Sequence, residues 1–356
     1  LKQLYGVEQA PCETQMREVL DPVNPNSLRS AFTTIHKQLQ RQTVLVKYQY
    51  LGGYLVSIDG TGQFSSTHLS CPDCCSRTLR NNHRQYYHQL LGAVIVHPQR
   101  NQVLPLFPEA ITRQDGDTKN DCERNASKRL LPALRQAFPK LKMLIVEDAL
   151  ASNVPHLKLL EELSLSYIIV VKPKDHAYLF DHVSQLQKSG KGIQFETISA
   201  NGIGRRYHFV NQVPLNASHP EWLVNFIEYW EWKEGQELYH NTWITDIEIH
   251  CDNAFDLTQA GRARWKVENE TFNTLKTQGY NLEHNYGHGN QHLSTVLAML
   301  MMLHFLIDQV QELAGPVFKA ARGRYPSRIQ RWATLRSRFC EHLLPNWEIL
   351  FIVILL

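Results

Sequence analysis

The sequence predicts an α/β protein in which helices flank a mixed β-sheet. The main observation is the order of elements between residues 54 and 171, where three strand-like runs are followed by alternating helices and strands. That order is typical of a mixed sheet with helices on its faces. A second observation is a series of aromatic-rich strands between residues 194 and 249, which predicts an all-β subdomain inserted into the sheet. Helical segments are expected at both ends of the chain.

The composition is that of an ordinary globular protein. Hydrophobic residues make up 43% and charged residues 20% of the 356 positions, which excludes a disordered or collagen-like chain. The net charge of +3 neither requires nor excludes a nucleic-acid partner. The seven cysteines are mostly isolated, so a reducing compartment such as the cytoplasm is favoured over a disulfide framework.

The first fifty residues are predicted to be helical, with Ser27 as the N-cap of one helix. The apolar positions of that helix, three to four residues apart, are Leu28, Phe32, Ile35 and Leu39. A strand is expected at 54–59, and the glycine-containing residues 60–62 are expected to end it.

The remaining elements follow the same patterns of apolar spacing. Further core strands are predicted at 90–97, 102–107, 142–146 and 167–171, with helices at 120–138 and 155–163. Residues 98–101 suit a hairpin between the first two of these strands. The strands of the β-rich stretch are expected at 194–199, 205–213, 223–232 and 238–249, and helical texture returns from residue 256. The apolar stretch 296–307 is interrupted by His304 and is shorter than the ~20 residues of a membrane span, so a core helix and no membrane partner are expected.

These elements divide the chain into five parts. They are an N-terminal helical segment (1–52), the first part of the sheet core (53–172), the β-rich insertion (173–254), the second part of the core (255–312) and a basic helical C-terminal segment (313–356).

Three acids stand out by their positions. Asp59 ends the first core strand, Asp148 follows the strand at 142–146, and Glu268 lies in a helix after the β-rich stretch. Carboxyl ends of neighbouring strands lie ~4.8 Å apart, so the two aspartates could share divalent cations that a glutamate from a packed helix completes. Carboxylate oxygens suit Mg²⁺, and two such ions stabilise the attacking and leaving oxygens of a phosphoryl displacement. For a single aspartate after a strand, a turn or cap role is the alternative.

Three stretches around these acids resemble the DDE transposases of bacterial insertion sequences. They are residues 54–61 with Asp59, residues 144–153 with Asp148, and residues 262–276 with Glu268. The resemblance implies an RNase H-like core with a β-rich insertion, in which the three acids bind two Mg²⁺ (or Mn²⁺) ions.

The activity implied by this resemblance is cut-and-paste DNA transposition. The enzyme would bind the ends of its element, hydrolyse a phosphodiester there as a metal-dependent endonuclease, and join the freed 3′-OH to target DNA. Double-stranded DNA, a homodimer on that DNA and a nucleoid-associated location in the bacterial cytoplasm are implied as well. Two alternatives remain: a metal-dependent nuclease on the same core, and an inactive or domesticated DNA-binding relic.

The third stretch keeps part of the family's pattern, which reads Tyr, two residues, Arg, three residues, Glu, six residues, Lys. Arg264 and Glu268 keep the three-residue gap, whereas Gly261 stands at the Tyr position and Lys276 comes seven residues after Glu268. Glu270 is a rival for the third acid, with Glu268 preferred. Arg264 could contact a DNA phosphate or pair with Glu268, and Lys276 could contact a phosphate or be solvated.

Further DNA contacts are expected elsewhere in the chain. Trp243, in the β-rich stretch, could stack on a base pulled out of the duplex, although packing in the core is commoner for tryptophan; Trp230 and Trp232 are open to the same two interpretations. A run of seven basic residues has no acid between 315 and 340, and it favours contact with the DNA backbone over a merely solvated face. The run is Lys319, Arg322, Arg324, Arg328, Arg331, Arg336 and Arg338.

Two other clusters have metal-binding chemistry. Cys71 and Cys74 together with His83 and His88 could form a tetrahedral zinc site; reduced cysteines in a loop are the alternative. A cluster of acids opens the helix at 120–138, where capping of the helix dipole is preferred over a role as extra metal ligands. Its members are Asp115, Asp117, Asp121 and Glu123.

Overall fold

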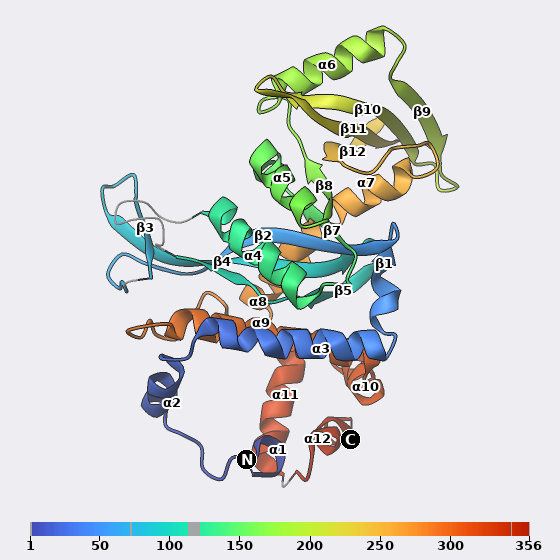
Figure 1. Ribbon diagram of the computed structural model, residues 1–356. Coiled ribbons are helices and arrows are strands. Elements are labelled where there is room, and N and C mark those ends of the chain that lie inside the picture. Colours follow the sequence, from blue (N-terminus) through green and yellow to red (C-terminus); the bar gives the residue numbers. More distant parts are fainter. Residues whose placement is uncertain (1, 72, 113–121, 343, 356) are drawn as a thin grey trace.

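The computed structural model describes residues 2–71, 73–112, 122–342 and 344–355. These residues form a mixed α/β structure in which a long twisted sheet is flanked by helices (Figure 1). Both ends of the chain lie at the same end of the molecule, where the indole of Trp347 donates a hydrogen bond to the carbonyl of Leu4.

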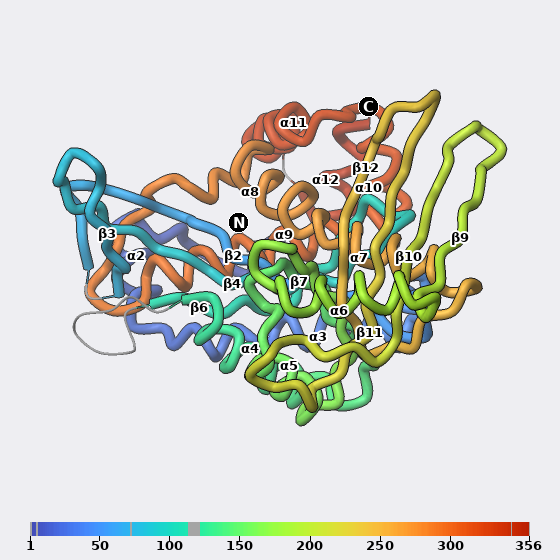
Figure 2. The backbone as a smooth tube through the Cα atoms, turned by 90° about the horizontal axis from the view of Figure 1, so that it is seen from above, coloured from blue at the N-terminus to red at the C-terminus, as the bar shows by residue number. Residues whose placement is uncertain are grey.

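The sheet contains 12 strands among the described residues. Nine of them follow one another in the order β3 (Cys75–Thr78), β4 (Arg84–His97), β2 (Gly53–Ser66), β7 (Met143–Glu147), β8 (Ser166–Val170), β12 (Gln236–Thr245), β11 (His219–Lys233), β10 (Gly204–Asn216) and β9 (Ile193–Ile198). The other three are β1 (Gln49–Tyr50), which pairs with β2, and β5 (Arg100–Pro105) and β6 (Glu109–Ile111), which pair with β4. Figures 1 and 2 show β3 and β9 at opposite ends of the sheet.

The strand directions make the sheet mixed, as the sequence predicts. β2, β7 and β8 are parallel neighbours, whereas β2 pairs with β4, and β8 with β12, in antiparallel fashion. Buried aliphatic runs on β2, β4 and β7 form the centre of the core. This burial explains why these strands could be identified from their apolar sequence.

Helices cover the sheet at several places. α4 (Glu123–Ala137) packs near β4 and β6, α5 (Val154–Glu162) packs near β8, and α6 (Ala177–Lys188) packs on β10. α9 (Leu293–Ala314) contacts β5 and also α3 (Arg29–Arg41). Two short segments cross the sheet region between α7 (Ala254–Arg262) and α9: the π-helix η4 (Val267–Phe272) and α8 (Asn273–Thr277).

A second, smaller hydrophobic cluster lies near the two termini. It contains Phe318, Leu335 and Leu350, which come from α10 (Pro316–Arg324), α11 (Arg328–Glu341) and α12 (Trp347–Val353). The helices α1 (Lys2–Tyr5) and α2 (Glu13–Leu20) lie on the same side of the molecule in Figure 1. The short 3₁₀ helices are η1 (Pro25–Leu28), η2 (Leu45–Tyr48) and η3 (Ala149–Ala151).

Several predicted boundaries were wrong. Residues 60–62 do not end β2, because the backbone of Gly60 and Thr61 still pairs with β4, and the strand continues to Ser66 with a register shift after Gly62. Ser27 is not the N-cap of α3; it lies within η1, which Asn24 caps.

The β-rich stretch joins the same sheet as the central strands. β12 pairs with β8 from Trp243↔Val170 to Thr245↔Ile168, so β9–β12 continue the sheet instead of forming a separate one. The helix α6, which the sequence analysis did not predict, packs on this part of the sheet (Figure 1).

Among the described helices, α9 alone is long and apolar enough to cross a membrane by length and composition. In the structure 56% of its apolar window is buried, and it contacts β5, α3 and α10. The predicted stretch 296–307 is therefore the middle of a longer helix.

Candidate functional site

Asp59 and Asp148 lie just beyond the paired residues of two neighbouring parallel strands. The pairing of β2 with β7 runs from Tyr54↔Met143 to Ser57↔Val146. Each aspartate comes two residues after its member of the last pair. Asp148 directly follows β7, whereas Asp59 lies inside β2, which continues to Ser66, so the prediction that Asp59 ends its strand was wrong. Both residues line one pocket of the structure, as the sequence analysis expects for a shared cation site.

The carboxylate of Asp59 is held by two donors. The backbone N–H of Gly60 donates to Oδ1 at 2.9 Å, and Nη1 of Arg264 donates to Oδ2 at 3.1 Å. Burial raises the pKa of Asp59, Arg264 and the Gly60 N–H lower it, and the charges of Asp148 and Glu268 raise it further, so that the pKa remains above its ordinary value. Crowded carboxylates of this kind are stabilised by a divalent cation.

Asp148 also has a local structural role. Its Oδ1 accepts a hydrogen bond from the backbone N–H of Leu150 at 2.9 Å and so caps η3. Asp148 therefore caps η3, as the alternative interpretation predicts, and also lines the pocket. The second oxygen of the carboxylate is not used by this cap.

Glu123 is a further acid of the same pocket. It is the first residue of α4 and lies against Gly60 of β2, where a Cβ atom would come 2.1 Å from its Oε1. Burial, followed by the charges of Asp59, Asp148 and Glu147, raises the pKa of Glu123 to about 7. The preferred interpretation of Glu123 as a helix cap therefore does not account for its position beside Asp59 and Asp148. Asp115, Asp117 and Asp121 lie outside the described residues.

A buried acid–histidine pair lines the same pocket. Nε2 of His156 is 2.6 Å from Oε2 of Glu147, and both side chains line the pocket. Burial lowers the pKa of His156, but the charge and hydrogen bond of Glu147 outweigh it and raise the pKa above its ordinary value. The pair fixes the end of β7 to α5. The pair could not be identified from the sequence, because a histidine nine residues after Glu147 gives no local signal.

The segment that carries Glu268 crosses the sheet at Asp59. The hydroxyl of Ser57 donates to the carbonyl of Arg264 at 2.9 Å. Further along, the Phe272 ring lies on Gly92, where a Cβ would come 2.8 Å from its Cζ atom, and Gly92 is the residue paired with Asp59. η4 is thereby held across β2 and β4.

Two expectations for this segment can be compared with the structure. Arg264 forms its ion pair with Asp59, at 3.1 Å, and not with Glu268. The charge of Glu268 contributes to the raised pKa of Asp59, whereas that of Glu270 acts on Lys266. Glu268 is exposed and does not belong to the lining of the pocket that holds the two aspartates.

The tryptophan expected to stack on a DNA base is buried. Trp243 has no exposed surface, and a Cβ at Gly261 would come 2.5 Å from its Nε1 atom. The indole thus packs beneath α7, so base stacking by Trp243 is wrong for this structure. Trp230 is partly exposed and stacks on His240, and Arg206 lies over both Trp230 and Trp232.

The basic C-terminal run is largely engaged inside the protein. Glu312, which is buried, forms ion pairs with Arg322, Arg328 and Arg331 at 3.0, 3.3 and 3.6 Å. Arg331 is only 2% exposed, so the expectation that it contacts DNA is wrong. Arg324 donates to the carbonyl of Leu355.

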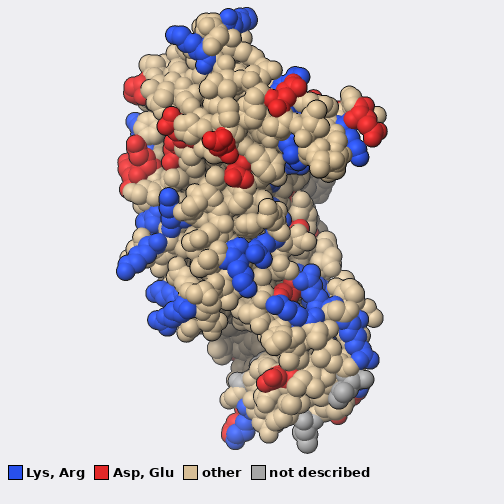
Figure 3. All heavy atoms as spheres, turned by 90° about the vertical axis from the view of Figure 1, so that its right-hand side faces the viewer, with Lys and Arg blue, Asp and Glu red and all other residues tan. Residues whose placement is uncertain are grey.

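A smaller set of cations remains on the surface. Lys276, which was expected at a phosphate, forms an ion pair with Glu283 at 2.9 Å. Figure 3 shows Lys and Arg side chains distributed over the middle and lower half of one face of the molecule. An open groove, which Glu312 also lines, is lined by four cations: Lys47, Arg100, Lys319 and Arg322. Two of these, Lys47 and Arg100, lie outside the predicted run.

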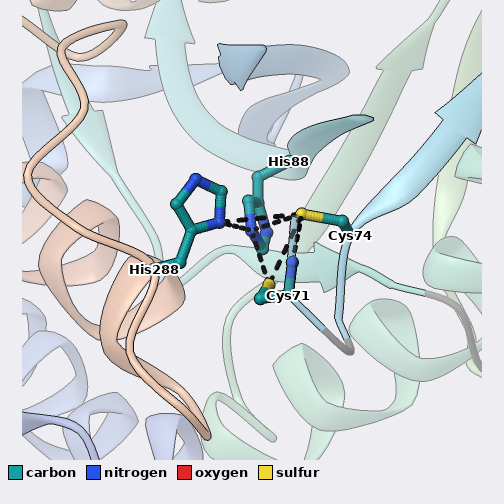
Figure 4. A group of neighbouring side chains, drawn as sticks. All are labelled: Cys71, Cys74, His88 and His288. Carbon is teal, nitrogen blue, oxygen red and sulfur yellow. Dashed lines mark hydrogen bonds between the residues drawn. The ribbon is translucent and has the colours of Figure 1, made fainter. Parts of the chain in front are cut away.

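A cysteine–histidine cluster lies elsewhere, next to the far end of β2. It consists of Cys71, Cys74, His88 and His288, whose possible ligand atoms all lie within 4.8 Å of one another (Figure 4). Three of these were candidates from the sequence. The fourth is His288 and not His83, which is exposed and lies beside β3 and β4.

Comparisons with family models and with curated proteins find no match to this chain.

Proposed function

We propose that this chain is a DDE transposase of the bacterial insertion-sequence type, which cuts and joins DNA in metal-dependent steps. The observation that carries the proposal is that Asp59 of β2 and Asp148, which directly follows β7, line one pocket beside two parallel strands. The segment η4, which carries the exposed Glu268, crosses β2 and β4 next to Asp59. Two distant parts of the chain thereby bring acids to one pocket, and the charge of Glu268, from a third part, acts on Asp59. Both observations support the triad that the sequence resemblance implies.

The order of elements supports an RNase H-like core. Apart from the short strands β3 and β6 and the 3₁₀ helix η3, the chain runs through β2, β4, β5, α4, β7, α5 and β8 in that order, which is the strand and helix order expected from the resemblance. β9–β12 and α6 lie between Asp148 and Glu268 in the sequence, as the proposed β-rich insertion requires.

The donor set fits hard divalent cations. Asp59, Asp148 and Glu268 would hold two Mg²⁺ or Mn²⁺ ions through carboxylate oxygens, with Glu123 as an additional acid of the pocket. Such ions, when bound, stabilise the attacking and leaving oxygens of a phosphoryl displacement. Arg264 and the Gly60 N–H orient the Asp59 carboxylate, and the buried Glu147–His156 pair fixes the strand end that presents Asp148.

The proposed substrate is double-stranded DNA, at the ends of the element and at its target. Lys47, Arg100, Lys319 and Arg322 line a groove that could follow a phosphate backbone, since DNA affinity comes chiefly from such contacts. A homodimer on DNA and a location at the nucleoid in the cytoplasm belong to the same proposal.

The test compares Asp59→Asn with a matched control, Asp252→Asn, which changes an exposed aspartate. Supercoiled plasmid carrying the sequences that flank the gene is incubated with each full-length protein and Mg²⁺, and nicking and strand joining are measured on gels. We expect Asp59→Asn to lose nicking by about 10³-fold or more, in line with the loss of a group that stabilises the transition state. DNA binding should remain in both variants, and Asp252→Asn should keep full activity.

The same assay separates the alternatives. Full activity in Asp59→Asn removes that residue from the mechanism. Cleavage by the wild-type protein without any strand joining supports a nuclease, and DNA binding without metal-dependent cleavage supports a relic.

A further inference from the structure

We propose that Cys71, Cys74, His88 and His288 bind one zinc ion, which fastens the segment before α9 to the strand β4 and to the loop before β3. This site is separate from the acidic pocket, and it would exist whether or not the protein is a transposase. Its four side chains converge on one point, as Figure 4 shows, although they come from three distant parts of the chain.

The distances between the ligand atoms are those of a tetrahedral site. The two sulfurs are 3.4 Å apart, Nε2 of His88 lies 3.2 and 3.3 Å from them, and Nδ1 of His288 lies 3.7 Å from Cys74 Sγ and 3.4 Å from His88 Nε2. Zn–S bonds of about 2.3 Å and Zn–N bonds of about 2.0–2.1 Å give tetrahedral edges of about 3.8 Å (S–S), about 3.6 Å (S–N) and about 3.3 Å (N–N). The five distances between ligand atoms therefore agree with the edges of a zinc tetrahedron to within a few tenths of an ångström.

Hydrogen bonds among the four side chains do not explain why their ligand atoms lie so close together. Nε2 of His88 lies within 3.4 Å of three other ligand atoms at once, but an imidazole nitrogen carries at most one proton. His88 and Cys74 are buried, with 2% and 4% of their surface exposed, where unsatisfied polar groups are costly. A single cation at the centre satisfies all four atoms together.

The ligand types in the cluster favour Zn²⁺ over Mg²⁺. Two thiolates and two neutral imidazoles form a common structural zinc set, and they neutralise the charge of Zn²⁺. Mg²⁺ prefers oxygen ligands in octahedral geometry, so it does not suit this site. No position of the set is left for a substrate, which indicates a structural ion.

The loop that carries the cysteines already has the hydrogen bonds that a bound thiolate needs. The backbone N–H of Cys71 points to Cys74 Sγ at 3.3 Å, and the N–H of Cys74 donates to the carbonyl of Cys71 at 3.1 Å. Cys75, the next residue, points elsewhere, with its Sγ directed at the carbonyl of Ile111. Cys71 and Cys74 therefore belong to the cluster, whereas Cys75 packs in the sheet.

The histidine from the far segment is held in place by its surroundings. Gly287 and Gly289 on either side of His288 have φ values of +112° and +66°, which glycine adopts without strain. The carboxylate of Asp21 accepts backbone hydrogen bonds from residues 290–293 and caps the start of α9. The Phe64 ring packs edge-on against His288, with ring centres 4.5 Å apart.

A zinc ion here would connect three parts of the chain at one point. It would join the loop before β3, the strand β4 and the segment 280–292, which leads from Glu268 and α8 into α9. The ion would therefore restrict the chain immediately after the proposed catalytic helix.

The test measures zinc in the full-length protein, purified without a histidine tag and under reducing conditions. After dialysis, elemental analysis should give about one zinc per chain, and exchange for Co²⁺ should give the intense visible bands of tetrahedral thiolate coordination. Cys74→Ser and His288→Ala should each lose the metal. The matched controls Cys251→Ser and His83→Ala, which change an exposed cysteine and the excluded histidine, should keep it.

Two further measurements test the zinc site independently of the ligand variants. If a ligand variant fails to fold, wild-type protein is stripped with a chelator and followed by hydrogen exchange; residues 280–292 should then exchange faster, and added Zn²⁺ should reverse the change. Asp59→Asn should retain its zinc, which distinguishes this site from the acidic pocket. Wild-type protein that takes up no zinc, or whose intact mass shows a Cys71–Cys74 disulfide under the same reducing conditions, overturns the proposal.

Discussion

The guanidinium of Arg264 donates to the carboxylate of Asp59 at 3.1 Å, across 205 residues of sequence. Its backbone carbonyl simultaneously accepts the Ser57 hydroxyl at 2.9 Å. Side chain and backbone of one residue therefore fix the turn after α7 onto the central strand. Because Arg264 and Asp59 are only 12% and 22% exposed at their side chains, removing either partner leaves a charge that water compensates incompletely.

Replacing Arg264 by Met is expected to destabilise the metal-free protein by about 1–3 kcal/mol, because Asp59 keeps its charge without its partner. The double variant Arg264→Met/Asp59→Asn should recover most of that loss, since neither charge remains. Urea unfolding of the wild-type protein, both single variants and the double variant gives the coupling free energy. Added Mg²⁺ should restore stability to Arg264→Met if a cation binds beside Asp59; a coupling free energy near zero would contradict the structural role.

Gly60→Ala is expected to impair the acidic pocket without harming the fold. A Cβ at position 60 would come 2.1 Å from Oε1 of Glu123, so that flexible carboxylate must move away. Metal-dependent nicking should fall about tenfold or more, a barrier increase of about 1.4 kcal/mol, and Glu123→Gln should have the same effect.

The matched control for this change is Gly62→Ala, two residues along the same strand. Among the described residues, no heavy atom lies within 4 Å of a Cβ built at Gly62 apart from its chain neighbours. Nicking by this variant should stay near the wild-type rate. Equal activity in all three variants would show that Glu123 has no part in the reaction.

The sequence was sufficient for the parts of the fold that depend on local pattern. Buried aliphatic runs identified β2, β4 and β7, and the acids after two of them indicated a common edge of the sheet. The pairing of Ser57 with Val146 then brings Asp59 and Asp148, two residues further along each chain segment, to one pocket.

Long-range contacts explain most of what the sequence analysis missed. His288 lies 200 residues from His88, so no spacing rule could select it over His83. Arg331 belongs to a run without acids, but the acid that neutralises it, Glu312, comes from α9, before the run begins. Trp243 has the composition of a stacking residue, and only its burial under Gly261 shows that it packs in the core.

Glu312 is expected to be one of the main electrostatic contributors to stability. Its carboxylate is 2% exposed and faces three guanidiniums, those of Arg322, Arg328 and Arg331. Glu312→Gln should reduce the free energy of unfolding by about 3 kcal/mol or more, because it leaves a buried arginine unpaired. Glu341→Gln, which removes the exposed pair with Arg338, should cost less than about 1 kcal/mol. Urea unfolding checks both, and similar losses in the two variants would contradict the burial argument.

The buried histidine of α3 should make stability depend on pH. Burial lowers the pKa of His36 from its ordinary value of 6.5 to about 4, whereas the Phe32 carbonyl, 2.9 Å from Nδ1, acts in the opposite direction. The unfolded chain therefore binds a proton below pH 6.5 that the folded protein does not accept until about pH 4. The contribution of His36 is fully present above pH 6.5 and decreases as the pH falls towards 4, by about 3 kcal/mol in total as an order of magnitude.

This prediction is checked by urea unfolding of wild-type protein and His36→Gln at intervals between pH 7.5 and 4.5. The variant should lose less stability on acidification than the wild type, because its amide does not titrate. His250→Gln is the control: His250 has a side chain that is 60% exposed, and its replacement should leave the pH dependence of the wild type unchanged. Parallel pH profiles for the wild type and His36→Gln would mean that His36 accepts its proton equally well in the folded and unfolded chains, which its burial in the core beneath α3 should prevent.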